Sequence, residues 1–527
     1  MNTFCFDVET SGLDRKEDKL ILIGAKYNKE DIYVDYPPYT KSAAYLKDSA
    51  VVKIGHNILF DVAFVEKYGL EVNGPLYDTR VMAFAKWPYD KLKLKQLGSK
   101  VFNVPVLELK SIKGLGKVED IAKPILEGYV KQDVQLTYDL FNLTYPVRGH
   151  WIDVVEFKLT EILHEIEKRG VFLETDKLRL LHGAWERQVK EISGKYTINL
   201  NSPKQLKEYL IQKGFTGQST DKVSLISSKE RIPECKEILK YRELSTLVGR
   251  YTGSFLKTQR EGYIYGEFNQ AGQEKNDFAV KTGRLSSSNP NLQNIPSRTS
   301  NGKALRKCFI APSGYKLVVA DASQIEPRFV AYFTKDETLT KIFTSGIDFH
   351  GVVTQAAYQK TDFTTDERFV GKTLGLATMY LASPYRLMME LRKYEIFLSL
   401  KEVEKRQNNI IKKFASVIEW GKRYAKLAES KGYFVTYGGR RYPFNNEVAV
   451  FNNLVQSSQA DYLKLCVLAI EERGHKIINT VHDEVLVYTK EPERTINDIN
   501  YIMSSVISLG DIPVKADVRE VTSWGDK

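Results

Sequence analysis

The stretch YKLVVADASQIEPR (residues 315–328) places a carboxylate at the end of a short apolar run, and it decides how the rest of the chain is interpreted. The run from Tyr315 to Ala320 predicts a strand, and Asp321 ends it. Much later in the chain, Asp483 and Glu484 lie inside an apolar hairpin pattern. A strand-end carboxylate near a hairpin carboxylate can hold two Mg²⁺ ions for in-line phosphoryl transfer. Taken alone, the second pair of acids also fits an ordinary polar hairpin tip.

A cationic helix face is predicted between these two motifs. Arg368 and Lys372 are four residues apart on a predicted helix, so both side chains project from one face. Tyr380 follows roughly two turns further along. Such a face suits a triphosphate with a stacked base, although the two cations alone would also fit a solvated helix face.

The first part of the chain alternates predicted strands with helices, which is typical of an α/β domain. The predicted strands are residues 4–9, 20–24 and 51–57, and a helix follows at residues 61–65. A joint is expected near residues 145 and 146, because a new helical spacing of apolar residues begins at Val154. Residues 270–300 are rich in Ser, Asn and Gly and are expected to contribute no core element.

Four acids and a tyrosine of this first part form a candidate metal site. Asp7 and Glu9 are two apart on a strand and therefore share one face. Asp61 lies in the first turn of a helix, and Asp133 follows Tyr129 by four residues on another. The set suits two divalent metals that clamp a phosphodiester, with a water oriented by the tyrosine. Taken singly, Asp61 would fit a helix cap, and Asp7 and Glu9 would fit a solvated strand edge.

Composition limits the class of protein. A chain of 527 residues exceeds one hydrophobic core and predicts roughly two to four domains. With 43% hydrophobic and 27% charged residues it is neither disordered nor collagen-like. The absence of a long apolar window and of a leader pattern predicts a cytoplasmic protein without membrane contact, and four scattered cysteines are expected to be reduced, buried thiols. Residues 1–150 carry a net charge of only +1 of the total of +11, so the remaining body is expected to meet a polyanion such as nucleic acid.

Three short motifs of the first part resemble, in order, those of the DEDD-type 3′–5′ proofreading exonucleases. They are Asp7-Val8-Glu9-Thr10, His56-Asn57 with Asp61, and Tyr129 with Asp133. A tyrosine four residues before the last aspartate resembles the DEDDy subgroup. This resemblance covers residues 1–145, and it implies an RNase H-like domain with metal ligands Asp7, Glu9, Asp61 and Asp133 and with Tyr129 as a catalytic residue.

The remaining motifs resemble family A DNA polymerases, the group of bacterial DNA polymerase I and several phage replicative enzymes. Asp321 to Arg328 looks like motif A, Arg368 with Lys372 and Tyr380 like motif B, and His482 to Glu484 like motif C. Further matches are residues 200–206, 282–296 and 348–350. The resemblance implies an α/β multidomain protein: an exonuclease domain (1–145), then a right-hand polymerase domain (146–527) with thumb about 151–270, palm about 271–335 and 433–527, and fingers about 336–432.

The resemblance also implies a role for each matching residue. Asp321 and Asp483 would hold the catalytic metals, Glu484 would support them, and Lys372 would protonate the leaving pyrophosphate. Glu326 would exclude ribonucleotides by crowding the sugar. The nucleotide-binding set is Gln324, Glu326, His350, Arg368, Lys372, Leu376 and Tyr380, and the DNA-binding set is Arg284, Asn291, Gln293, Asn452, Gln456 and His482. The cofactor would be Mg²⁺, or Mn²⁺ in its place, with two ions at each active site.

The expected activity is DNA-templated DNA synthesis with 3′–5′ proofreading by a monomer. Its partners would be primer-template DNA, dNTPs and a processivity or replisome factor. Because no 5′-nuclease domain precedes the exonuclease motifs, a phage replicative enzyme in a bacterial host cytoplasm is favoured. The alternatives are a 3′–5′ exonuclease whose degenerate polymerase body only grips DNA, a single-subunit RNA polymerase and a DNA-binding scaffold without activity.

Five positions depart from the family pattern, and two of them, Ala377 and Leu381, replace glycines. Ala322 replaces a tyrosine, Pro327 replaces a leucine and is expected to bend the segment or remove a backbone donor, and Leu376 replaces an aromatic residue. Leu376 is expected to change the sensitivity to dideoxynucleotides without abolishing activity.

Overall fold

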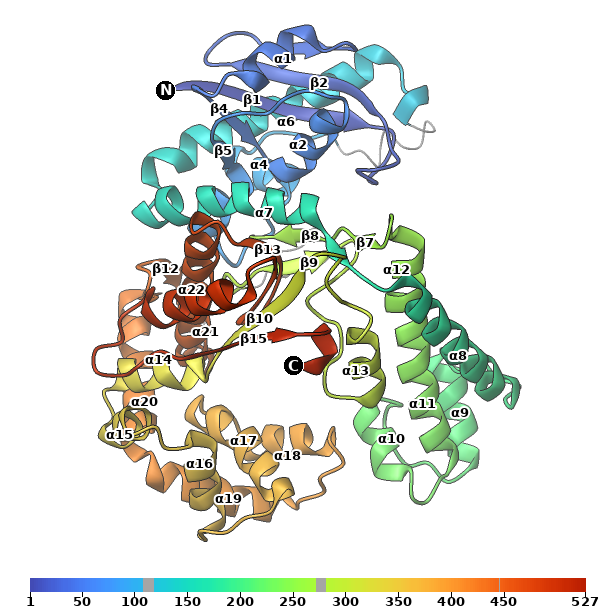
Figure 1. The fold of residues 1–527 in the computed structure, drawn as a ribbon, viewed down its shortest axis with the longest axis vertical. Coiled ribbons are helices and arrows are strands. Elements are labelled where there is room, and N and C mark those ends of the chain that lie inside the picture. Colours follow the sequence, from blue (N-terminus) through green and yellow to red (C-terminus); the bar gives the residue numbers. More distant parts are fainter. Residues whose placement is uncertain (108–117, 272–280, 445) are drawn as a thin grey trace.

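The computed structural model describes residues 1–107, 118–271, 281–444 and 446–527. An N-terminal unit sits on a larger body, and helix α7 (Phe157–Arg169) runs between the two (Figure 1). The larger body has two helical limbs, which flank a central sheet (Figure 1). Within the described ranges, none of the helices combines the length and the hydropathy that a membrane crossing requires.

A five-stranded mixed sheet forms the N-terminal unit, in the order β3-β2-β1-β4-β5. Its central strand β1 (Asn2–Thr10) pairs antiparallel with β2 (Leu20–Tyr27) and parallel with β4 (Val51–Gly55). Phe4, Cys5 and Phe6 on β1 are all fully buried, as expected for a strand covered on both faces. The three predicted strands are confirmed, except that the third ends at Gly55. The other elements are β3 (Tyr33–Asp35), β5 (Leu76–Asp78), α1 (Thr40–Lys47), α2 (Ile58–Lys67), α3 (Thr79–Lys86), α4 (Leu94–Phe102), η1 (Val118–Asp120) and α6 (Lys123–Thr144).

The joint between the two units is a helical turn rather than an extended linker. A π-helical segment η3 (Ile152–Glu156) runs directly into α7, and Val155 and Phe157 are buried there. The first limb follows and packs around a core of its own that includes Leu206 and Ile238. Its elements are α8 (Thr175–Gly194), α9 (Pro203–Gln212), α10 (Lys222–Ser228), α11 (Glu234–Thr246), η4 (Leu247–Thr252) and α12 (Gly253–Thr258).

An antiparallel sheet in the order β13-β14-β10-β15 forms the centre of the body. The predicted strand is confirmed as β10 (Lys316–Ala322), and the predicted hairpin as β13 (Lys476–Val481) with β14 (Glu484–Thr489). Strand β15 (Ala516–Val521) closes the sheet, while α21 (Glu447–Glu472) and α22 (Pro492–Ser505) pack against each other beside it. Short elements around this centre are η2 (Tyr145–Val147), β6 (Val171–Phe172), β7 (Tyr263–Ile264), β8 (Glu267–Asn269), β9 (Ser286–Ser288), α13 (Ser300–Arg306), β11 (Tyr433–Val435), β12 (Arg441–Pro443) and η5 (Trp524–Asp526).

The second limb is entirely helical between residues 325 and 431. Gly371 and Gly375 allow two of its helices to pack closely, because a Cβ on Gly371 would collide with Thr354. The same helix carries Arg368 and Lys372, and Arg368 pairs with Asp348 at the start of the neighbouring helix. The elements are α14 (Ile325–Thr334), α15 (Glu337–Thr344), α16 (Phe349–Tyr358), α17 (Thr365–Met379), α18 (Pro384–Arg392), α19 (Leu400–Lys413) and α20 (Ala415–Lys431).

Two sequence-based expectations need correction. Residues 270–300 do contribute to the core, since Leu292 and Ile295 are 1% and 2% exposed; residues 272–280 lie outside the described ranges. Pro327 costs α14 no helical hydrogen bond, because it falls in the first turn, where backbone N–H groups have no helical partner. The expectation for the four cysteines is confirmed as far as burial goes, because all are buried and free.

Two candidate active sites

The first candidate site lies where β1 meets α6. Asp7 and Glu9 project from β1 and Asp133 from α6, and one ligand atom from each lies within 4.8 Å of the others. Carboxylate oxygens are the ligands that hard divalent cations such as Mg²⁺ prefer, so this donor set fits the predicted metal. Glu9 and Asp133 are each only 6% exposed. Tyr129, one turn before Asp133 on α6, is 8% exposed.

Asp61 lies beside this group but is held differently. It falls in the first turn of α2, and its Oδ1 accepts a hydrogen bond from the backbone N–H of Val8, at 3.0 Å. That bond holds the Asp61 carboxylate against the backbone of β1, near Asp7. It is not one of the three acids whose ligand atoms cluster.

Burial makes these carboxylates resist ionisation. Burial raises the pKa of Asp7 to about 7, and the charge of Lys95 lowers it in part. The pKa values of Glu9 and Asp61 are raised well above their usual range by burial first and then by the charge of Asp7. A divalent cation among the acids would reverse these shifts, because it stabilises the charged form.

Lys95 was not identified from the sequence. It lies in the first turn of α4, contacts the carboxylate of Asp133 and places its Nζ 4.0 Å from the centroid of the Tyr129 ring. Its segment, KLKLK (residues 91–95), looks like ordinary exposed sequence, so no local signal distinguishes this lysine.

The second candidate site lies on the central sheet of the body. Asp321 on β10 stands opposite Glu484 of β14 in the strand register, and the backbone N–H of Ala322 donates to the carbonyl oxygen of Asp483 at 3.2 Å. The sheet therefore brings together the two acids that the sequence separates by 162 positions. Burial and then the charge of Asp321 raise the pKa of Asp483 to about 7. Burial also raises the pKa of Asp321, and Lys527 lowers it in part.

Two further residues of this site were not predicted. The Nζ of Lys527 lies 3.1 Å from Oδ1 of Asp321 and also contacts Glu484. The indole Nε1–H of Trp524 donates to Oε1 of Glu484 at 2.5 Å. Glu484 is thus held from two sides by protein groups, which fits a supporting rather than a primary acid. Neither residue belongs to a periodic pattern in the sequence.

Three of the seven predicted nucleotide-binding residues lie on α17. Arg368, Lys372 and Leu376 follow one another at intervals of four residues, and Arg368 pairs with Asp348 at the start of α16 (Nη2 to Oδ1, 3.1 Å). Beside them, burial and the charge of Lys372 lower the pKa of His350 to about 4, so this imidazole is neutral at neutral pH. Leu376 is half-buried against the core.

Glu326 links the end of α17 to the central sheet. Its Oε1 accepts from Arg284 at 2.5 Å and its Oε2 from the hydroxyl of Tyr380 at 3.2 Å. Burial and then the charge of Glu326 raise the pKa of Tyr380. Gln459 of α21, which the sequence did not single out, contacts the same Arg284. Gln324, with a left-handed φ of 56°, immediately precedes α14.

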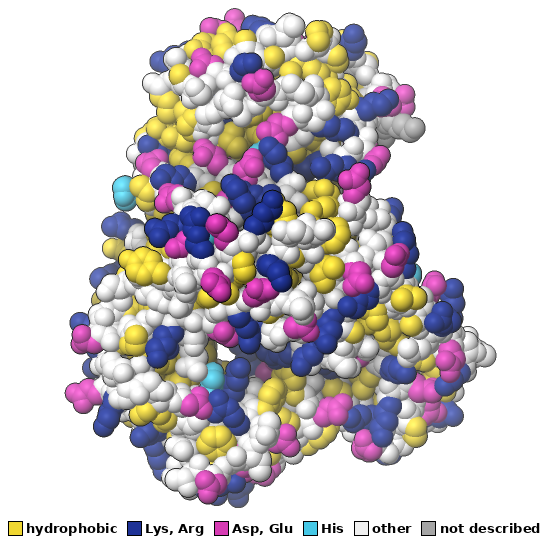
Figure 2. All heavy atoms as spheres, viewed as in Figure 1, with side chains coloured by type: hydrophobic (Ala, Val, Ile, Leu, Met, Phe, Trp, Pro, Cys, Tyr) yellow, Lys and Arg dark blue, Asp and Glu magenta, His cyan; other side chains and the backbone are white. Residues whose placement is uncertain are grey.

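Apart from Arg284, which bonds to Glu326, the predicted DNA-binding residues fall into two groups. Gln293 donates to the carbonyl oxygen of Thr480 at 2.8 Å, and with His482 it lines a hollow of about 390 Å³. Asn291 closes the adjacent turn by accepting from the backbone N–H of Gln293 at 3.0 Å. Asn452 and Gln456 lie one turn apart on α21, both half-buried. Lys and Arg side chains border the opening between the two limbs on the face in Figure 2.

Comparison with known proteins settles the family. Residues 175–526 match the model of DNA polymerase family A, and residues 1–143 match a 3′–5′ exonuclease model. The chain belongs to DNA polymerase family A. It is 25% identical to DNA polymerase I of Borreliella burgdorferi over 99% of this chain and 62% of that protein. With the thermostable DNA polymerase I of Thermus aquaticus it shares 32% identity over 70% of this chain and 48% of that protein.

The fold is that of a family A polymerase. The POL domain of Pol1 from M. smegmatis, solved in complex with DNA primer-template and dNTP, superimposes with a TM-score of 0.83 at 24% identity, covering 99% of this chain and 96% of that one. The predicted fold class, an exonuclease domain followed by a polymerase domain, is therefore confirmed. This chain spans less than two thirds of the curated relatives just named. The boundaries of the domains and of the thumb, palm and fingers stay predictions, as do the roles of single residues.

Proposed function

We propose that this chain extends a DNA primer along a template with dNTPs and removes mispaired 3′ nucleotides at a second site. The observation that carries the proposal is that Asp321 and Asp483 lie together at one end of the central sheet, where β10 ends and the β13–β14 hairpin turns. That end of the sheet is linked to the cationic helix α17 through the hydrogen bond from Tyr380 to Glu326. Membership of DNA polymerase family A supports it.

At the polymerase site, Asp321 and Asp483 would hold divalent cations, expected to be two Mg²⁺. When bound, such ions polarise the phosphate and stabilise the charge that develops during in-line transfer. Arg368 and Lys372 would bind and orient the triphosphate, and Lys372 would supply a proton to the pyrophosphate oxygen that leaves. Glu326, held in place by two hydrogen bonds, would exclude a sugar that carries a 2′-hydroxyl.

At the exonuclease site, Asp7, Glu9, Asp61 and Asp133 would hold two further divalent ions, and the Tyr129 hydroxyl would orient the attacking water. The cluster of buried carboxylates supports this assignment, because ionised acids this close need a compensating cation. Replication of a phage genome, a monomeric state, a replisome factor and the cytoplasm of a bacterial host complete the proposal, and they rest on the family resemblance alone.

The test is a gel assay on a 5′-labelled primer-template with Mg²⁺, with and without dNTPs. Asp321→Ala/Asp483→Ala is expected to abolish extension and keep shortening, and Asp7→Ala/Glu9→Ala is expected to do the reverse. Shortening without extension by the unmodified chain under all conditions would instead favour an exonuclease whose polymerase body only grips DNA.

A further inference from the structure

Lys95 is a buried cation placed among the acids of the exonuclease site. Only 12% of its side chain is exposed, and its Nζ contacts Asp133 and lies over the ring of Tyr129. It sits in the first turn of α4, which packs against α6. The N-terminal turn of a helix disfavours positive charge, so nearby carboxylates are needed to stabilise the ammonium group of Lys95 at this position.

The charge of Lys95 reaches beyond Asp133. Asp7 and Glu9 contribute ligand atoms to the same cluster, within 4.8 Å of Asp133. In both acids the lysine charge lowers the pKa, against the larger effect of burial. One ammonium group therefore lies beside the clustered carboxylates of Asp7, Glu9 and Asp133, three of the four acids that are proposed to hold metal.

We propose that Lys95 is a positioning residue whose ammonium group takes the place of one divalent cation in the exonuclease site. The site then holds one divalent ion firmly and admits a second only when Lys95 moves away from Asp133. This inference rests on the proposed exonuclease function. The second ion must compete with the ammonium group of Lys95. Exonuclease activity is therefore expected to depend more steeply on metal concentration than it would in a site without this lysine.

Counting bound Mn²⁺ by electron paramagnetic resonance tests the proposal directly. The titrations use the full chain carrying Asp321→Ala/Asp483→Ala, so that the polymerase acids do not contribute. We expect one tight and one weak Mn²⁺ in this background. Adding Lys95→Met is expected to tighten the weak site by about tenfold or more, because it removes a unit positive charge that contacts one of the ligand acids.

Two matched variants separate the charge of Lys95 from general effects of substitution. Lys95→Arg keeps a cation and is expected to keep the weak second site. Lys100→Met removes an exposed lysine of the same helix, which pairs with Asp90 at 2.5 Å, and is expected to change nothing. Melting temperatures in EDTA supply an independent readout: Lys95→Met is expected to melt lower than Lys100→Met without metal and to gain more from added Mn²⁺.

The possible failures are distinguishable. Equal affinity for the second Mn²⁺ with and without Lys95→Met would overturn the role of Lys95 and leave the exonuclease proposal intact. If Asp7→Ala/Glu9→Ala removes no bound Mn²⁺ from the same background, the metal site itself is absent, and both proposals are overturned.

Discussion

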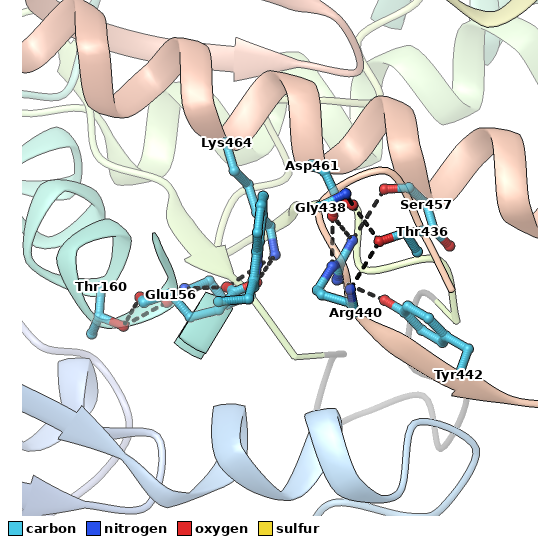
Figure 3. Close-up of polar contacts among 11 residues, drawn as sticks. Glu156, Thr160, Thr436, Gly438, Arg440, Tyr442, Ser457, Asp461 and Lys464 are labelled. Carbon is cyan, nitrogen blue, oxygen red and sulfur yellow. Dashed lines mark hydrogen bonds and ion pairs between the residues drawn. The ribbon is translucent and has the colours of Figure 1, made fainter. Parts of the chain in front are cut away.

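The salt bridge between Glu156 and Lys464 gives a quantitative test of how the two units are joined. Figure 3 shows Glu156, just before α7, facing Lys464 of α21. The Nζ of Lys464 donates to both carboxylate oxygens, at 2.7 and 2.9 Å, and the two residues are 3% and 1% exposed. Trp151 and Gln270 also donate to the carboxylate, at 2.8 and 2.9 Å.

Lys464→Met should strongly lower the free energy of unfolding. The substitution leaves an ionised carboxylate buried without its cation, which typically costs about 3–5 kcal/mol. We expect the lower end, about 3 kcal/mol, because the donors Trp151 and Gln270 remain and Arg440 is near enough to lower the pKa of Glu156. The double variant Glu156→Gln/Lys464→Met removes both charges and should lie within about 1.5 kcal/mol of the unmodified protein.

Thermal unfolding followed by circular dichroism measures this difference. At roughly 2 °C per kcal/mol, Lys464→Met should lower the Tm by about 6 °C, and the double variant should recover at least half of that loss. Lys190→Met is the matched control, since Lys190 pairs with Glu186 on the surface of α8 and such exposed pairs contribute about 0–1 kcal/mol. A double variant no more stable than Lys464→Met would refute the reasoning.

Four further predictions concern the pH dependence of this ion pair and three single positions. The pKa of Glu156 lies below 4.5, since Lys464 and Arg440 outweigh burial, so the stability from this ion pair is present above pH 4.5 and lost as the pH falls through the lower folded pKa. The difference in Tm between the unmodified protein and the double variant should accordingly shrink in acid, and a constant difference would contradict this. Leu381→Gly should raise the Tm by about 1–2 °C, because a left-handed φ of 62° costs leucine about 1–2 kcal/mol and the flexibility of glycine offsets part of the gain. Leu376→Tyr should change the ratio of dideoxynucleotide to deoxynucleotide incorporation in primer extension, and unchanged ratios would exclude a role for this position. Glu326→Ala should raise ribonucleotide incorporation by about tenfold or more relative to dNTPs, measured with single nucleotides on one primer-template; equal selectivity would remove Glu326 as the sugar gate.

The strands and acids could be predicted because their signals are local. Alternation of apolar residues identifies β1, and a carboxylate at the end of an apolar strand identifies Asp321 whatever the rest of the chain does. The prediction that residues 270–300 contribute no core element was wrong because composition averages over a window, whereas burial is decided residue by residue. Leu292 and Ile295 enter the core from a segment rich in polar residues, and Gln293 between them is held by Thr480.

Lys95 and Lys527 could not be predicted because their contacts are tertiary. Lys95 meets an acid 38 positions away, and Lys527 meets Asp321 across more than 200 positions. Lysine is the residue type most often found on surfaces, so a sequence pattern favours solvent for both. Only the fold shows that each lysine lies beside acids.

Both sites hold several carboxylates close together, and in both a lysine of the chain lies beside them. Each site concentrates buried carboxylates: burial raises the pKa of Asp7 to about 7 in one, and burial and then the charge of Asp321 raise the pKa of Asp483 to about 7 in the other. Each also carries a lysine in contact with its acids: Lys95 contacts Asp133, and Lys527 contacts Asp321 and Glu484. A cation supplied by the chain lowers the cost of assembling the acids before metal arrives. The same cation must then yield to a divalent ion, so metal affinity and metal-free stability are expected to be opposed at both sites.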